Sequence, residues 1–455
     1  MCKRNSFKIV TIFLIFTLFM SNIFALEIPK LYCKSAILMD LDSGRILYGI
    51  NENKKVYPAS TTKVLTAILA LESLDISSST VVSSEAVKLP YASSNAALKQ
   101  GEVMTITDLL YALMLKSGND AANVLAEAVS GSINEFVILM NKKAKEIGCT
   151  NTHFANAHGY HDNNHYTTPV DMMKILSYAV KNEQFVKIFS TREYTITKTN
   201  KTNQNRIYQN TNRLILTKED SYLSRYYEYC IGGKTGYTDE AGRTLVAYAK
   251  KDDKNLLLGV FNSNPSGIED LRYTDSINLF EYGFNNFEKS KILEKSDYSF
   301  SYENTENDMI YSYSLADDIF TLTNTEENSA ISVVKYDVSL DYDALSKYDI
   351  NTEDYKNQVV GSIKIEFSQN SSIYDKEYDL VLQDIEQIPW LNRKGTQKLL
   401  TNILICIVCV LVFVILLKIF IKTLKKKKKK TKPTISSRYI KRNVNYKSRR
   451  KRQVK

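Results

Sequence analysis

A segment of fifteen residues, 57–71, constrains the fold more than any other part of the sequence. It reads YPASTTKVLTAILAL. Proline is favoured in the first turn of a helix, and the dense run of Ala, Leu and Ile that follows predicts a buried helix. Ser60 is therefore expected in the first turn of a core helix, where Lys63 lies on the same face. A serine that shares a buried face with a lysine amine can act as a nucleophile.

The same Ser-x-x-Lys spacing occurs twice more, without a suitable scaffold. Ser332 and Lys335 fall in an alternating apolar and polar pattern that predicts a strand. On a strand, residues three apart point to opposite faces, so this lysine cannot serve this serine. Ser448 and Lys451 lie in a basic tail with no core around them. The pair in the apolar helix remains the catalytic candidate.

The positive charge of the chain is confined to its two ends. The 455 residues carry a formal charge of +10 and leave room for two or three domains. Residues 1–26 hold three basic side chains and residues 422–455 hold 17, and neither segment has an acidic one. The segment between them carries 40 basic and 50 acidic side chains. Its acidic balance argues against a nucleic-acid-binding domain there.

Cysteine usage excludes a disulfide-stapled fold. Of the six cysteines, three lie in the body of the chain, at Cys33, Cys149 and Cys230. They are few and widely spaced, which is typical neither of a disulfide framework nor of a metal-binding cluster.

Both ends carry signals that involve a membrane. Residues 1–25 have a basic start, an apolar stretch and a small residue, which is the order of a cleaved secretory signal peptide. An uncleaved membrane anchor is the alternative. Residues 399–421 are long and apolar enough to predict a transmembrane helix, and the basic tail 422–455 places the C-terminus in the cytoplasm. The tail is interpreted as a topology and anionic-lipid signal, with nucleic acid or a cytosolic partner as the alternative.

The body of the chain divides into two predicted domains. Residues 28–285 begin with two apolar runs around a turn at 42–44, which predict a hairpin. Helical segments follow, including 106–116, and two strand-like runs at 244–250 and 256–261 close the segment. This order predicts one α+β domain whose two ends share a sheet. Alternating patterns in residues 290–385, among them 331–340 and 360–367, predict short strands and a small β domain.

Three separated motifs supply the groups that a serine nucleophile needs. Ser60 and Lys63 provide the nucleophile and its base. Ser117-Gly118-Asn119, in a break between two helices, can present a hydroxyl and an amide to a cleft. Lys234-Thr235-Gly236, at the start of a strand, offers an ammonium, a hydroxyl and a close backbone approach. Each triplet alone is common, whereas the ordered set is not.

This ordered set resembles the penicilloyl-serine fold superfamily, and more narrowly the low-molecular-mass penicillin-binding proteins that are D-alanyl-D-alanine carboxypeptidases. The resemblance covers about residues 28–285. It extends to FANAHGY at 154–160, HYTTPVD at 165–171, NTNRL at 210–214 and KTGYT at 234–238. It implies a β-lactamase/transpeptidase-like α+β domain, an antiparallel sheet with helices on both faces and a helical subdomain. Members commonly end in an amphipathic helix on the membrane, whereas this chain has a helix of spanning length.

The resemblance also implies a role for each motif residue. Ser60 attacks the carbonyl between two terminal D-alanines of a peptidoglycan stem peptide and forms an acyl-enzyme, with Lys63 as the base. Ser117 relays the proton to the leaving amine and Asn119 holds the substrate backbone. The terminal carboxylate is bound by Lys234 and Thr235, beside Gly236, and the backbone amides of Ser60 and Tyr237 form the oxyanion hole. Arg213 is a further candidate for the carboxylate. β-Lactams are expected as inhibitors, and no cofactor is expected.

Three other functions stay open. All four histidines lie within residues 153–165, which raises a zinc site, but neither ordered ligand spacing nor a His-Glu-x-x-His motif is present. A β-lactamase of the same fold is the second, although the second motif is Ser-Gly-Asn and no glutamate is evident for activating a deacylating water. A catalytically inactive, membrane-tethered scaffold that binds the wall is the third.

Overall fold

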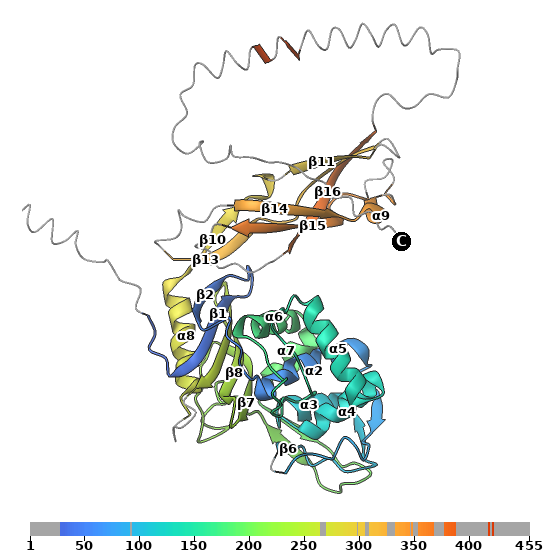
Figure 1. Ribbon diagram of the computed structural model, residues 1–455, viewed down its shortest axis with the longest axis vertical. Helices are drawn as coiled ribbons and strands as arrows, with labels where there is room; N and C mark the ends of the chain where they lie inside the picture. The colour runs from blue at the N-terminus through green and yellow to red at the C-terminus, as the bar shows by residue number, and fades with distance from the viewer. Residues whose placement is uncertain are drawn as a thin grey trace, which may run out of the picture. The chain divides into compact units, whose positions relative to one another are not determined.

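The computed structural model describes most of the chain between residues 28 and 387 (Figure 1). The predicted signal peptide, the basic tail and most of the predicted transmembrane helix lie outside the described residues. Within the described residues, no helix combines the length and the apolar character needed to cross a bilayer. The described ranges are 28–91, 93–263, 270–297, 299–304, 309–324, 333–345, 347–348, 354–367, 377–387, 417–418 and 421–422.

A five-stranded antiparallel sheet carries the catalytic candidates. Its strand order is β2-β1-β9-β8-β7, so the N-terminal hairpin pairs with a strand from near residue 260. The predicted hairpin and the predicted meeting of the two ends in one sheet are thereby confirmed. The strands are β1 (Cys33–Asp40), β2 (Ile46–Ile50), β7 (Cys230–Thr238), β8 (Gly242–Lys251) and β9 (Lys254–Ser263).

Helices cover both faces of this sheet. In β1, Ala36 and Leu38 pack into the core on one face, whereas Ile37 and Met39 pack into the core on the other. This alternation follows from the two-residue period of a strand. α8 (Arg272–Asn286) packs on the first face, and α6 (Pro169–Ala179) packs on the second (Figure 1).

Five further helices form a cluster with α6 on the second side of the sheet (Figure 1). Side-chain caps fix several of their starts: Thr105 accepts a hydrogen bond from the Asp108 N–H, and Thr168 accepts one from the Asp171 N–H. α2 lies in the middle of the cluster, with eight consecutive buried residues from Lys63 to Ala70. The helices are α2 (Lys63–Ser73), α3 (Ile106–Met114), α4 (Asn119–Ser130), α5 (Ile133–Glu146) and α7 (Glu183–Ser190).

Two element boundaries differ from the prediction. Ser60 lies in a short 3-10 turn, η1 (Ala59–Thr62), immediately before α2 rather than inside the α-helix. The third motif lies inside β7 rather than at its start, because the strand begins earlier, at Cys230. Gly232 and Gly233 lie within this strand, next to a register irregularity between Cys230 and Gly232, and their lack of side chains leaves room for neighbouring groups. A Cβ on them would come within 2.5 Å of the Phe189 ring and the Asn212 amide, respectively.

The C-terminal part of the described chain is built of strands. β10 (Glu288–Leu293) pairs with β13 (Ile319–Thr323), and a five-stranded sheet has the order β11-β12-β16-β15-β14. The predicted strands at 331–340 and 360–367 appear as β14 (Val333–Leu340) and β15 (Val359–Phe367). The domain limits 28–285 and 290–385 stay predictions. The other elements are β11 (Ser299–Asn304), β12 (Met309–Leu315), α9 (Tyr342–Leu345) and β16 (Glu377–Gln387).

Candidate active site

The predicted nucleophile, Ser60, lies in a strained turn. Ala59, just before Ser60, has φ of +49°, which is unusual for a residue with a side chain. The Ala59 carbonyl accepts a hydrogen bond from the Thr62 hydroxyl at 2.8 Å. Gly159 packs directly against this carbonyl, since a Cβ on it would lie 1.8 Å from the Ala59 oxygen. The packing of Gly159 against this carbonyl therefore helps to keep the turn in its strained conformation.

Lys63 contacts the nucleophile directly. Its Nζ lies 2.9 Å from Ser60 Oγ, 2.8 Å from Asn119 Oδ1 and 2.7 Å from the His158 carbonyl oxygen. A neutral amine has two N–H donors and one lone pair. The amide oxygen and the carbonyl can take the two donors, and the lone pair then faces the Ser60 hydroxyl. The site thus accommodates Lys63 as a base without leaving a polar atom unpaired.

The surroundings favour the neutral form of Lys63. The side chain is fully buried, and burial lowers its pKa well below the usual 10.5. The positive charge of Lys234 lowers this pKa further, while the carboxylate of Asp120 raises it. A depressed pKa lets an amine accept a proton near neutral pH.

The second motif occupies the break between α3 and α4, as predicted. Ser117 has φ of +61°, and its Oγ lies 3.0 Å from Nζ of Lys234. Asn119 is the first residue of α4, and its backbone N–H donates to the Ser94 carbonyl. The turn therefore presents the Ser117 hydroxyl toward the third motif and the Asn119 amide toward Lys63.

The third motif brings β7 against the nucleophile. A Cβ on Gly236 would lie 2.4 Å from Thr244 Oγ1 and 2.9 Å from the Ser60 nitrogen, so only glycine fits here. This approach places the Ser60 N–H beside the strand whose next residue is Tyr237. The Tyr237 side chain is 54% exposed, and its backbone N–H follows Gly236 in the strand. These are the two amides predicted to form the oxyanion hole.

Lys234 is the second buried lysine of the site. Burial is the main cause that lowers its pKa from 10.5 to about 7, and the charge of Arg272 adds to the effect. Its Nζ also lies 3.0 Å from the Thr235 carbonyl oxygen. The Thr235 hydroxyl donates to Thr211 Oγ1 at 2.8 Å. Lys234 at about half protonation near neutral pH can still bind a carboxylate, because the bound anion favours the charged form.

Two charged residues of the site were missed by sequence reasoning. Arg272 Nη1 donates to the carbonyls of Gly236 and Thr244, both at 3.1 Å, which places its charge behind the third motif. Arg213, the predicted candidate for this role, lies over the Tyr273 ring at 5.8 Å, and its role stays a prediction. No local signal marks Arg272, since its closeness to β7 depends on how α8 crosses the sheet.

Asp120 is the other residue that was missed. It is 2% exposed, and its carboxylate accepts hydrogen bonds from the backbone N–H groups of Ala96, Leu98 and Ala121. These bonds tie the loop around residue 96 to the start of α4. The position directly after Asn119 was the only available signal, and it does not distinguish a functional carboxylate from an ordinary helix-start acid.

The histidines serve the nucleophile turn and its surroundings. His165 Nδ1 accepts the Ala155 N–H, so the proton of the neutral ring is on Nε2, which donates to Thr62 Oγ1. Burial lowers the pKa of both His158 and His165 to about 3, so both rings are neutral at neutral pH. Among the described residues, no group of three or more His, Cys, Asp or Glu side chains could hold a metal ion.

The chain is similar in sequence to curated proteins and in fold to solved structures. The D-alanyl-D-alanine carboxypeptidase DacF of Bacillus subtilis is 34% identical over 266 residues, 58% of this chain and 65% of the relative. DacB2 of Mycobacterium tuberculosis is 32% identical over 57% of this chain and 85% of the relative. A crystal structure of penicillin binding protein 5 from Haemophilus influenzae matches with a TM-score of 0.58, at 26% identity over 80% of this chain and 100% of that one.

A crystal structure of a D-alanyl-D-alanine carboxypeptidase from Mycobacterium tuberculosis matches with a TM-score of 0.51, at 30% identity over 58% of this chain and 95% of that one. The chain spans just under two thirds of the curated Bacillus subtilis, Haemophilus influenzae and Escherichia coli relatives, at 65%, 66% and 64% of their lengths. The family model for D-alanyl-D-alanine carboxypeptidases, Peptidase S11, matches residues 22–265, which is more than half of the chain. The chain therefore belongs to this family.

Proposed function

We propose that the protein is a serine-type D-alanyl-D-alanine carboxypeptidase that removes the terminal D-alanine from peptidoglycan stem pentapeptides. The observation that carries the proposal is the contact of the buried Lys63 amine with Ser60 Oγ at 2.9 Å. The second and third motifs meet beside it, where Lys234 donates a hydrogen bond to Ser117. Family membership supports the same reaction class.

In the proposed first step, each proton has a stated donor and acceptor. Neutral Lys63 accepts the Ser60 proton as Oγ attacks the carbonyl carbon between the two D-alanines. The oxyanion is stabilised by the backbone N–H groups of Ser60 and Tyr237. When the intermediate collapses, the C–N bond breaks and the amine of the terminal D-alanine takes a proton from protonated Lys63 through Ser117. Water then hydrolyses the acyl-enzyme and restores the Ser60 hydroxyl.

The terminal carboxylate of the substrate is assigned to the third motif. Lys234 supplies the positive charge and Thr235 supplies a hydroxyl, while Asn119 binds the peptide backbone. Burial of Lys234 makes its interaction with an anion stronger than at the surface, because the local dielectric is low. The same groups would receive the carboxylate of a β-lactam, which leads to covalent binding at Ser60.

The proposal places this chemistry outside the cell and next to the membrane. The predicted signal peptide at 1–25 directs export, and the predicted helix at 399–421 with its basic tail tethers the protein. The predicted signal peptide and nearly all of the predicted helix and tail lie outside the described residues, and the support for them is the sequence. Peptidoglycan is the partner expected at that location.

The test uses the full-length chain in detergent, with a labelled penicillin and a pentapeptide ending in D-Ala-D-Ala. A covalent adduct on Ser60 and release of D-alanine are expected, and both should be lost in Ser60→Ala. Ser448→Ala, which changes the decoy serine in the basic tail, is the matched control and should leave both unchanged. If the unmodified protein forms no adduct and releases no D-alanine, the proposal is wrong. Loss of activity on treatment with a chelator would instead favour a zinc enzyme.

A β-lactamase is the second candidate function. It differs in the fate of the acyl-enzyme, which a lactamase hydrolyses rapidly with an acidic group that activates water. Slow release of the labelled penicillin is expected here, since the sequence offers no glutamate for that task. Rapid turnover of penicillin in the same assay would favour the lactamase.

A further inference from the structure

A chain of three hydrogen bonds links the backbone at Ala155 to the backbone that directly precedes Ser60. The Ala155 N–H donates to Nδ1 of His165 at 3.1 Å, and Nε2 of His165 lies 2.8 Å from Oγ1 of Thr62. The Thr62 hydroxyl in turn donates to the Ala59 carbonyl at 2.8 Å. His165, Thr62 and Ala59 are all buried, so these groups have to satisfy one another.

The direction of every bond in this chain is fixed by its two ends. A backbone N–H can only donate, and a carbonyl oxygen can only accept. The Thr62 hydroxyl therefore gives its single proton to the Ala59 carbonyl and accepts from His165, which must carry its proton on Nε2. The other end requires the same tautomer, because Nδ1 of His165 accepts the Ala155 N–H. A neutral histidine ring thus satisfies the whole chain.

The last bond of the chain acts on the peptide unit that contains the Ser60 N–H. The Ala59 carbonyl and the Ser60 N–H belong to one planar peptide, in which they point in opposite directions. The backbone before this peptide is strained, since Ala59 has φ of +49°. A hydrogen bond that holds the Ala59 carbonyl therefore also sets the direction of the Ser60 N–H, which is one of the two predicted oxyanion donors.

We propose that His165 is a positioning residue for the oxyanion hole: through Thr62 it holds the Ala59–Ser60 peptide so that the Ser60 N–H points at the oxyanion. The inference rests on the proposed function and deepens it, because it gives a role to a histidine outside the three motifs. Oxyanion stabilisation is needed when the acyl-enzyme forms and again when water hydrolyses it. Loss of the chain should therefore lower kcat and leave KM nearly unchanged.

The test measures kcat and KM for D-alanine release from a pentapeptide ending in D-Ala-D-Ala, with the full-length chain in detergent. Thr62→Val keeps the shape of the side chain and removes the hydroxyl. His165→Asn keeps an acceptor close to the place of Nδ1 but is too short to reach Thr62. Each variant should lower kcat by about 10-fold to 100-fold, which is less than the roughly 100-fold to 1000-fold cost of removing an oxyanion donor, because the Ser60 N–H is still present.

Conservative variants should keep the activity. Thr62→Ser retains a hydroxyl, and His165→Gln has an amide N–H that can reach Thr62, so kcat should stay within about threefold of the unmodified protein in both. The double variant Thr62→Val/His165→Asn should be no slower than Thr62→Val alone, because His165 acts through Thr62. Thermal unfolding of each variant sets an assay temperature at which all of them are folded.

Thr66, about one turn further along α2, provides the matched control. Its hydroxyl is also buried and donates to a loop carbonyl, that of Ala157, at 2.6 Å. This carbonyl is not part of the Ser60 peptide. Thr66→Val should therefore keep kcat within about threefold, although it loses a hydrogen bond of the same kind as Thr62→Val does.

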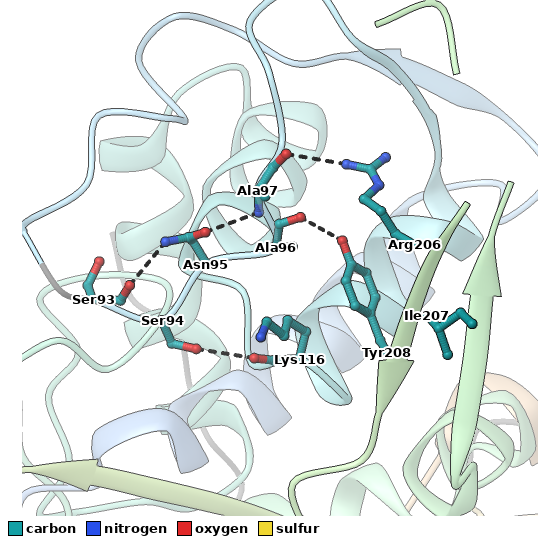
Figure 2. A pocket seen from close by; sticks show the side chains of 9 residues that line it. All are labelled: Ser93, Ser94, Asn95, Ala96, Ala97, Lys116, Arg206, Ile207 and Tyr208. Atoms are coloured by element: carbon teal, nitrogen blue, oxygen red, sulfur yellow. Dashed lines mark hydrogen bonds between the residues drawn. The ribbon is translucent and has the colours of Figure 1, made fainter. Parts of the chain in front are cut away.

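Tyr208, on β6 (Arg206–Gln209), provides a second control at another loop beside the site (Figure 2). Its hydroxyl donates to the Ala96 carbonyl at 2.6 Å, and the Ser94 carbonyl of the same loop accepts the Asn119 N–H. Tyr208→Phe removes a bond that holds this loop but does not reach the Ser60 peptide, so kcat should again stay within about threefold.

Unchanged kcat in Thr62→Val or in His165→Asn would overturn the inference, and so would a change confined to KM. An equal loss of kcat in Thr66→Val would overturn it too, because any buried hydroxyl of α2 would then have the same effect. A double variant in which the two losses multiply would show that His165 acts independently of Thr62, against the inference. In all these outcomes the unmodified protein still releases D-alanine, whereas its failure to do so would overturn the proposed function instead.

Discussion

Replacing Gly159 by alanine should damage catalysis although residue 159 takes no part in the chemistry. The new Cβ would lie 1.8 Å from the Ala59 carbonyl oxygen, and the two atoms must separate by about a further 1.2 Å to reach 3.0 Å. The Ala59 carbonyl directly precedes Ser60, and the His158 carbonyl, on the other side of the contact, is bonded to Lys63. The nucleophile and its base therefore move relative to each other. A displacement of about 1 Å at reacting groups costs roughly 100-fold in rate, or about 2.7 kcal/mol.

Gly131 provides the matched control. It has φ of +77°, close to the +86° of Gly159, but a Cβ on it would meet nothing within 4 Å. Gly131→Ala should lose only about 1–2 kcal/mol of unfolding free energy from backbone strain and keep the rate of acylation. Gly159→Ala should lose more stability and, in addition, acylate about 100-fold more slowly with a labelled penicillin. Acylation by Gly159→Ala at the rate of Gly131→Ala would refute the argument that the loop behind Ser60 fixes the nucleophile.

Three further predictions concern the charges of the site. The first concerns pH: kcat/KM for the D-Ala-D-Ala peptide should rise with pH as Lys63 loses its proton, because Lys63 must be neutral to act as the base. It should then fall above about pH 7, by up to tenfold per pH unit, as Lys234 loses its proton, since the pKa of Lys234 is about 7. A profile that stays flat from pH 6 to 9 would contradict this prediction. Arg272→Ala removes a charge that lowers the Lys234 pKa, so the alkaline limb should move to higher pH, and an unmoved limb would speak against the link between these residues. Asp120→Asn removes the charge that raises the Lys63 pKa, so the acidic limb of the pH profile should move to lower pH. Thermal unfolding should also show that the free energy of unfolding falls by about 1–3 kcal/mol, because the N–H of Leu98 loses its acceptor. An unchanged acidic limb together with unchanged stability would reject both the electrostatic and the structural role of Asp120.

Local rules were sufficient for the parts of the site that lie on one element. Ser60 and Lys63 are three residues apart, so their contact depends only on the geometry of one turn and the start of one helix. The hairpin at 42–44 and the helices around Ser117 follow from turn chemistry and periodicity in the same way. These local patterns, together with the resemblance of the motifs to a known family, were enough to predict a mixed helix and sheet fold from the sequence.

Contacts between distant elements were beyond these rules. Arg272 contacts Gly236 because of where α8 crosses the sheet, and the two residues are 36 positions apart in a stretch of sequence that gives no sign of this contact. The hydrogen bond from the Ala96 N–H to the Asp120 carboxylate likewise depends on the path of the loop around Ala96 in the folded chain. The start of β7 at Cys230, earlier than predicted, includes Gly232 and Gly233, whose lack of side chains is required by Phe189 and Asn212, which only the folded chain brings close.

The close contact between Gly236 and the Ser60 turn limits how the protein could escape β-lactams. A resistant variant must discriminate against the drug while keeping its substrate, which requires a side chain to change near the nucleophile. At residue 236 even one extra carbon collides with Thr244 and the Ser60 backbone, and at 159 it collides with Ala59. Both positions are therefore closed to substitution. Selection can act more freely on exposed positions at the rim, such as Tyr237.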